Sequence, residues 1–116
     1  MGRFENLVIW QRARELAKIV HHTTRDFRND ANLRDQMRRA AISIAANIAE
    51  GSERISRPDF RRFLSIARAS CGELRSHVHL ALDADHIDQP QHLELIDRCS
   101  RLGRRISAMI TWTERT

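Results

Sequence analysis

Hydrophobic residues recur every three or four positions in four successive stretches, which is the period of a helix with one buried face. We expect helices over about residues 6–25, 32–50 and 57–84, and a fourth that begins near Pro90. Residues 113–116 are expected to fray. No stretch alternates between apolar and polar residues as a strand would. This pattern predicts an all-α fold, an antiparallel up-down-up-down four-helix bundle that forms one domain over residues 1–116.

Residues at the predicted helix ends suggest how the helices start and stop. Asn6 is suited to cap the first helix, and Gly51 is suited to a left-handed C-cap after the second. Ser56, followed by Pro58 and Asp59, has the pattern of a capping box that starts the third helix. A DNA-binding helix-turn-helix is the alternative for this region, but the third helix is several turns longer than a recognition helix.

The residues expected in the core share the three-to-four spacing. In the first helix they are Ile9, Ala13, Leu16, Val20 and Thr24. In the third helix they are Phe60, Phe63, Leu64, Ala67, Cys71, Leu74, Val78 and Ala81. In the fourth helix they are Leu93, Ile96, Leu102, Ile106 and Ile110. One continuous core between the four helices follows from these faces.

The second predicted helix differs from the others because it has apolar residues on two sides. One side, which includes Met37 and Ile44, suits the core of the bundle. We expect the other side to form a subunit interface, because a single core cannot cover both sides. The interface residues are Ile42, Ala45, Ala46 and Ala49.

A line of polar residues runs along the second helix, between its two apolar sides. We expect them to form a mostly buried, hydrogen-bonded cluster with polar residues of the third helix. The members of this predicted polar cluster are Arg39, Ser43, Asn47, Glu50, Ser70 and Glu73. A ligand-binding or active site at the same residues is the alternative interpretation.

The charge balance suits an anionic partner, and a charged bundle whose arginines pair with its own acids is the alternative. The chain has 20 Lys and Arg against 15 Asp and Glu, a formal net charge of +5, and all but one of the cations is arginine. Arginine is suited to two-point contacts with phosphate or carboxylate, although pairs such as Glu94 with Arg98 can neutralise part of this charge locally. No apolar run approaches the roughly 18 to 20 residues of a membrane span, so we expect no membrane partner.

Residue patterns that support catalysis or metal binding are missing. No two of the six histidines stand four residues apart on one helix face, and none neighbours a cysteine at metal-ligand spacing. Phosphate-binding glycine loops and nucleophile elbows are also absent. Cys71 and Cys99 lie in helical patterns and suit small core positions in a reduced cytoplasm. We therefore expect a cytoplasmic protein without enzymatic activity, metal or cofactor.

Two segments carry a resemblance to a known family. They are LRDQMRRAAISIAANIAEGS at residues 33–52 and DFRRFLSIARAS at residues 59–70, followed by Glu73-Leu74. Together they resemble the bacterial four-helix-bundle proteins encoded in intervening sequences of large-subunit (23S) rRNA genes. Residues 4–17 resemble that family's first helix, so the resemblance covers most of the chain and is weak only after Asp83.

The resemblance implies more than the pattern of residues does. It implies an antiparallel four-helix bundle that assembles into a closed ring, commonly a homopentamer. Related bundles serve as accessory variability proteins of diversity-generating retroelements, in which a basic surface contacts nucleic acid and a reverse transcriptase. The biochemical role of the rRNA-linked branch itself is not settled. The family's polar motif corresponds to Arg39, Ser43, Asn47, Glu50, Gly51, Ser70 and Glu73.

Two classes of function follow from the charge and the resemblance. The first is a ring-forming protein that binds RNA or DNA through phosphate contacts, because no aromatic residues stand among the arginines to stack on bases. The expected contact residues are Arg61, Arg68, Arg75, Arg98, Arg101 and Arg105. The second is an interaction scaffold whose arginines meet acidic partner proteins.

Overall fold

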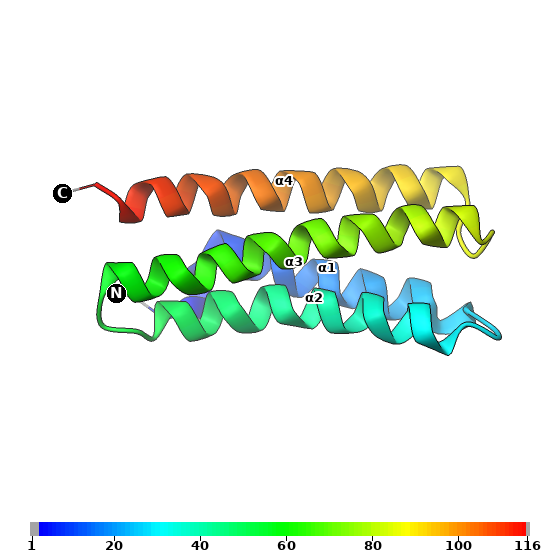
Figure 1. Ribbon diagram of the computed structural model, residues 1–116, viewed down its shortest axis with the longest axis horizontal. Helices are drawn as coiled ribbons and strands as arrows, with labels where there is room; N and C mark the ends of the chain where they lie inside the picture. Colours follow the sequence, from blue (N-terminus) through cyan, green and yellow to red (C-terminus); the bar gives the residue numbers. More distant parts are fainter. Residues whose placement is uncertain (1–2, 116) are drawn as a thin grey trace.

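Four long α-helices make up most of the computed structural model, which describes residues 3–115 (Figure 1). The long helices are α1 (Val8–Thr23), α2 (Ala31–Ser52), α3 (Arg57–Asp83) and α4 (Gln89–Thr113). Two single-turn 3₁₀ helices, η1 (Phe4–Asn6) and η2 (Thr24–Asp26), flank α1. The described residues contain no strand, which confirms the all-α prediction.

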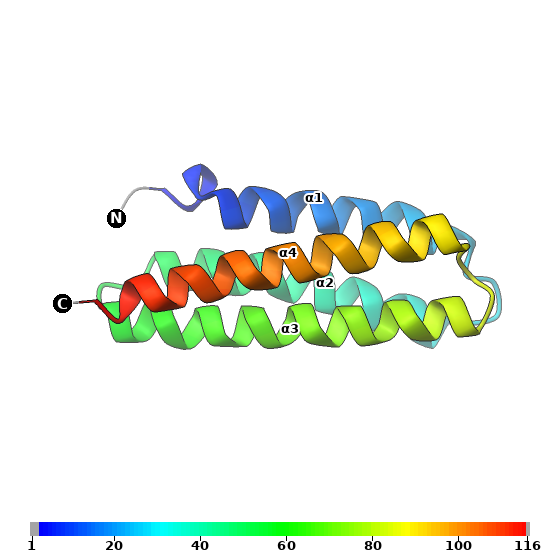
Figure 2. The ribbon, with the colours of Figure 1, turned by 90° about the horizontal axis from the view of Figure 1, so that it is seen from above.

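The helices run antiparallel and form a rod of 48 × 19 × 19 Å (Figure 1). Seen from above, α1 begins and α4 ends at the same end of this rod (Figure 2). Each helix packs against the next one along the chain, and α1 also contacts α4, so the four helices enclose a central space. The predicted four-helix bundle is confirmed. None of these helices is both long enough and apolar enough to cross a membrane.

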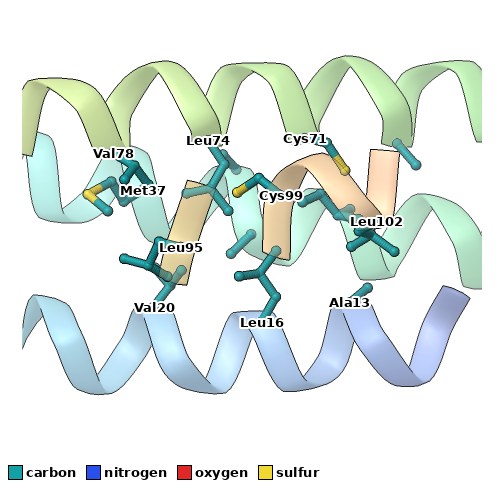
Figure 3. Close-up of a cluster of buried hydrophobic side chains, with 14 of the residues drawn as sticks. Ala13, Leu16, Val20, Met37, Cys71, Leu74, Val78, Leu95, Cys99 and Leu102 are labelled. Carbon is teal, nitrogen blue, oxygen red and sulfur yellow. The ribbon is translucent and has the colours of Figure 1, made fainter. Parts of the chain in front are cut away.

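Side chains from all four helices fill the central space, as Figure 3 shows for its middle part. The largest fully buried side chains include Leu16 of α1, Met37 and Ile44 of α2, Leu74 of α3 and Leu95 of α4. Burial of a side chain of this size stabilises the fold by about 1.5 to 3 kcal/mol. This core fixes the rotation of each helix and so decides which polar residues face each seam.

The rotation of α4 differs from the predicted one. Leu93, expected in the core, is 64% exposed, whereas Leu95 is buried. Ile96 and Ile110 are partly buried and pack against the edge of the core. The buried residues of α4 are Leu95, Cys99, Leu102, Ile106 and Thr113. Cys99 belongs to this face with regular three-to-four spacing, which confirms the expected core position of this cysteine. The error lay in starting the apolar face at Leu93 rather than at Leu95.

Two of the predicted helix caps are wrong, and the third is confirmed in part. Asn6 lies in η1, and α1 starts after Leu7, which makes no side-chain cap. Gly51 lies within α2 and does not have a positive φ. The left-handed positions are instead Asn29 and Asp85, in the loops before α2 and before α4. Ser56 caps α3, with its hydroxyl oxygen accepting the backbone N–H of Asp59 at 3.2 Å, but the reciprocal contact from the Ser56 backbone to the Asp59 side chain that would complete the predicted capping box does not form.

Gly51 is needed for close packing between α2 and α3 rather than for a turn. A Cβ atom at this position would lie 2.7 Å from Cβ of Phe63 and 3.0 Å from Cδ1 of Phe60. These distances are too short for ordinary carbon contacts. The absence of a side chain therefore lets the end of α2 approach the start of α3.

Candidate nucleic-acid interface

A groove of about 440 Å³ runs along the seam between α3 and α4. Gly72 of α3 and Gly103 of α4 both line it, and a Cβ atom at either position would have no neighbour within 4 Å. Both glycines lie in the middle of long helices, where glycine costs about 0.5 to 1 kcal/mol relative to alanine. The missing side chains deepen the groove, because nothing else fills the space.

Three arginines line this groove, which we call the α3–α4 arginine groove. They are Arg68 and Arg75 of α3 and Arg104 of α4. Its other polar side chains are the hydroxyls of Ser65, Ser100 and Ser107, and no carboxylate lines it. Among residues 3–115, none of the three arginines forms a salt bridge. The groove therefore combines uncompensated positive charge with hydroxyl groups.

The sequence explains why these arginines have no partners. An acidic residue three or four positions away along a helix is the usual local partner of an arginine. No Asp or Glu stands at these distances from Arg68, Arg75 or Arg104. Arg104 was missed in the sequence analysis. The absence of local acids points to it, but Arg61 and Arg105 share this signal, so the sequence could not single it out.

In the seam between α1 and α4, by contrast, the arginines have acidic neighbours. This seam forms a groove of about 320 Å³ in which arginines alternate with Glu15, Glu94 and Asp97. Arg98 donates to Glu94 at 3.2 Å and to Glu15 at 3.1 Å, so it links α4 to α1. Arg101 pairs with Asp97 at 3.1 Å. Arg98 and Arg101 are thus largely neutralised, unlike the arginines of the α3–α4 groove.

The remaining predicted contact residues, Arg61 and Arg105, lie outside the arginine groove. Arg61 donates from Nε to the hydroxyl of Thr113 and from Nη2 to its carbonyl oxygen, both at 3.1 Å. This contact holds the end of α4 on α3. Thr113, expected to fray, is consequently buried, while Thr116 lies outside the described residues. Arg105 lies in the α1–α4 groove, which three carboxylates also line.

Cys71 and Cys99 also line the arginine groove. Both residues are buried members of the core, and Figure 3 shows them on α3 and α4 within it. Burial raises the pKa of each thiol to about 12, because the thiolate would be poorly solvated. The thiols are therefore protonated at neutral pH and lack the thiolate character that nucleophilic cysteines require.

Comparison with known proteins identifies the family of this chain. The family model described as "23S rRNA-intervening sequence protein" matches residues 5–108. The chain belongs to this family. A search of curated proteins finds no match.

A solved structure supports the fold of this member of the 23S rRNA-intervening sequence family. It is the crystal structure of a protein of unknown function from the S23 ribosomal protein family of Bacteroides thetaiotaomicron. The alignment has a TM-score of 0.82 and 24% identity, and it covers 89% of this chain and 98% of that chain. At this identity the similarity shows the shared fold.

Part of the predicted polar cluster forms in this family member. The hydroxyls of Ser43 and Ser70 lie 2.9 Å apart and join α2 to α3. The Asn47 side-chain nitrogen donates to the Ser43 carbonyl at 2.8 Å and to its hydroxyl at 3.1 Å. All three side chains are half-buried. This triad is a polar contact within an otherwise apolar seam.

The charged residues of the predicted cluster do not join this triad, so the prediction of a mostly buried cluster is wrong for a single chain. Glu50 is exposed and pairs with Arg54 at 2.8 Å, one turn further along. Arg39 and Glu73 are exposed, and neither forms a salt bridge within the described residues. The physical reason is the helix rotation, which points these longer side chains outward while the short ones face the seam.

The predicted interface residues line a separate, apolar groove of about 350 Å³ between α1 and α2. Phe4 precedes α1, and Trp10 of α1 contacts it edge to face with ring centroids 5.1 Å apart. From α2, Ile42 is 62% exposed beside this groove. Its other lining residues are Arg14, Ala17, Ala45, Ala46 and Ala49. We call this surface the α1–α2 apolar groove.

Proposed function

We propose that this protein is a non-enzymatic, ring-forming protein that binds RNA or DNA through phosphate contacts in the α3–α4 arginine groove. The observation that carries the proposal is the segregation of charge between two neighbouring seams. Arginines in the α1–α4 groove have carboxylates beside them, whereas the α3–α4 arginine groove has none. A seam that concentrates unpaired arginine attracts polyanions more strongly than the net charge alone would indicate.

The geometry of the groove suits a phosphate backbone. Arg68 and Arg75 are seven residues apart, so their positions along α3 differ by about 10.5 Å. Arg104 contributes from the opposite wall, and the hydroxyls of Ser100 and Ser107 supply further donors, while the Ser65 hydroxyl donates to the Arg61 carbonyl at 3.0 Å. Guanidinium and hydroxyl groups are common partners of phosphate oxygens, and contacts to phosphate carry no base specificity. We therefore expect binding that tolerates many sequences.

The test replaces the three groove arginines and measures affinity at several salt concentrations. Each phosphate contact on duplex DNA adds about 0.9 to the slope of log affinity against log salt. The triple variant Arg68→Gln, Arg75→Gln, Arg104→Gln should thus lower this slope by about 2 to 3 units for each engaged subunit. Single-stranded RNA and duplex DNA are titrated separately.

A matched control removes the same charge elsewhere. Arg12, Arg34 and Arg101 each pair with a nearby carboxylate, and replacing all three by Gln gives the same change in net charge. This control should retain most of the affinity and of the salt dependence. Equal losses in the two triple variants would assign binding to net charge rather than to the groove. Unchanged affinity in the groove variant would favour an acidic protein as the partner.

The proposed ring uses the α1–α2 apolar groove as the contact between subunits. An exposed isoleucine next to small residues and two aromatic rings leaves apolar surface that a second copy can cover. A contact of this kind that joins different faces of identical chains closes into a ring when the rotation allows it. The family resemblance makes a pentamer the expected size. A ring would also repeat the arginine groove, so weak phosphate contacts would add by avidity.

Sedimentation of two isoleucine variants tests the contact. Ile42→Glu places a charge at the apolar groove, while Ile55→Glu changes an isoleucine that is fully exposed in the loop after α2. We expect the wild type and Ile55→Glu to sediment as the same oligomer and Ile42→Glu as a monomer. A monomeric wild type at micromolar concentration, or an intact oligomer of Ile42→Glu, would refute the proposed interface.

A further inference from the structure

Two histidines meet across the seam between α3 and α4. Nε2 of His92 lies 3.0 Å from Nδ1 of His79, and the ring centroids are 5.0 Å apart. His79 stands seven residues after Gly72, so it lies on the same side of α3 as the arginine groove, about one turn beyond Arg75. The sequence analysis examined only pairs within one helix and could not detect this pair.

We propose that His79 and His92 together bind a divalent transition metal, Ni²⁺ or Cu²⁺. Imidazole nitrogens are good ligands for both ions. Two nitrogens that are 3.0 Å apart and each about 2.1 Å from a metal subtend an angle of about 91° at that metal. This angle matches neighbouring positions of a square-planar or octahedral ion. It is narrower than the roughly 109° of tetrahedral zinc.

The metal takes the place of the proton that now links the two rings. Without metal, one ring donates an N–H to the lone pair of the other. With metal, both lone pairs face the ion, and each ring carries its proton on the remaining nitrogen. For His79 that nitrogen is Nε2, on an exposed side chain that water can reach.

The surroundings of His92 set the expected affinity. Its Nδ1 is buried and has no hydrogen-bond partner in the described part of the chain. Imidazoles that bind metals usually donate this second N–H to a partner, which strengthens binding. Within residues 3–115, no group of three or more His, Cys, Asp or Glu side chains is placed to hold a metal. We therefore expect water in the remaining positions and micromolar rather than nanomolar affinity.

Calorimetric titration of the full, tag-free chain with Ni²⁺ tests this site. We expect one saturable Ni²⁺ per chain and a higher melting temperature with Ni²⁺, because the metal binds the folded protein and connects α3 to α4. His79→Gln should weaken binding by about tenfold or more and abolish the Ni²⁺-dependent rise in melting temperature. His92→Gln should do the same. Because His79 is exposed, its replacement should leave the helical circular dichroism unchanged.

The pair His21 and His22 provides the control. Their ring centroids are 5.9 Å apart, and the two rings share no hydrogen bond. The double variant His21→Gln, His22→Gln removes the same number of imidazoles as the two single variants combined and should bind Ni²⁺ like the wild type. The proposal is overturned if the wild type shows no saturable binding, or if His79→Gln retains wild-type affinity. A loss of binding in the control variant would instead place the metal at α1.

Discussion

Replacing Gly51 by alanine should destabilise the bundle, even though alanine is the better helix former. Gly51 lies in the last turn of α2, against the first turns of α3. The added Cβ would lie 2.7 Å from Cβ of Phe63, which is attached directly to the α3 backbone. Rotation of the Phe63 side chain cannot relieve this contact, so the two helices have to move apart. Phe60, which is fully buried, lies 3.0 Å away on the same side.

Two opposing effects determine the size of the change. Alanine in a helix interior is favoured over glycine by about 0.5 to 1 kcal/mol. Forcing an extra carbon into a close-packed contact costs about 1 to 3 kcal/mol. The packing cost outweighs the helix preference, so we expect a net loss of about 1 to 2 kcal/mol in the free energy of unfolding. In a domain of this size that loss lowers the melting temperature by roughly 4 to 8 °C.

The other two helical glycines supply the controls for this measurement. A Cβ at Gly72 or Gly103 has no neighbour within 4 Å, so only the helix preference changes. Gly72→Ala and Gly103→Ala should each stabilise the fold by about 0.5 to 1 kcal/mol in urea denaturation followed by circular dichroism. If Gly51→Ala also stabilised the protein, the reasoning from the close helix approach would be refuted.

Two further predictions concern polar contacts, one between the loops before α2 and before α4 and one between α2 and α3. A hydrogen bond from His86 at 2.8 Å, and then one from the backbone of Leu33, lower the pKa of Asp30. Its carboxylate thus stabilises the fold above the ordinary aspartate pKa, and this contribution is lost as the pH falls through the lowered value. Asp30→Asn should therefore flatten the decline of melting temperature in acid, and an unchanged decline would contradict this assignment. Ser70→Ala should cost about 1 kcal/mol by removing the contact with Ser43, whereas Glu73→Gln should change stability by less than about 0.5 kcal/mol in urea denaturation. A larger cost for Glu73→Gln would indicate that Glu73 has a partner in the assembled protein.

The arginines show how much of the candidate site was accessible from the sequence. The heptad spacing of Arg68 and Arg75 placed them on one face of a helix, and the structure puts both in the groove. Arg61 has the same spacing, but its guanidinium is used to hold Thr113, 52 residues away along the chain. Arg98 likewise reaches Glu15 on another helix. Such partners cannot be read from local spacing, because they depend on which helices become neighbours.

The sequence by itself determined the four long helices, because helix periodicity is a local property. The predicted range 57–84 agrees with α3 to within one residue, and Ser56 caps that helix as expected. Tertiary structure alone decided the role of Gly51, since a glycine after an apolar run fits both a turn and a close helix contact. It also decided that Gly72 and Gly103 face the same seam and that His79 meets His92. These features arise where two helices meet, and the rotation of each helix about its axis is fixed by the shared core rather than by either segment alone.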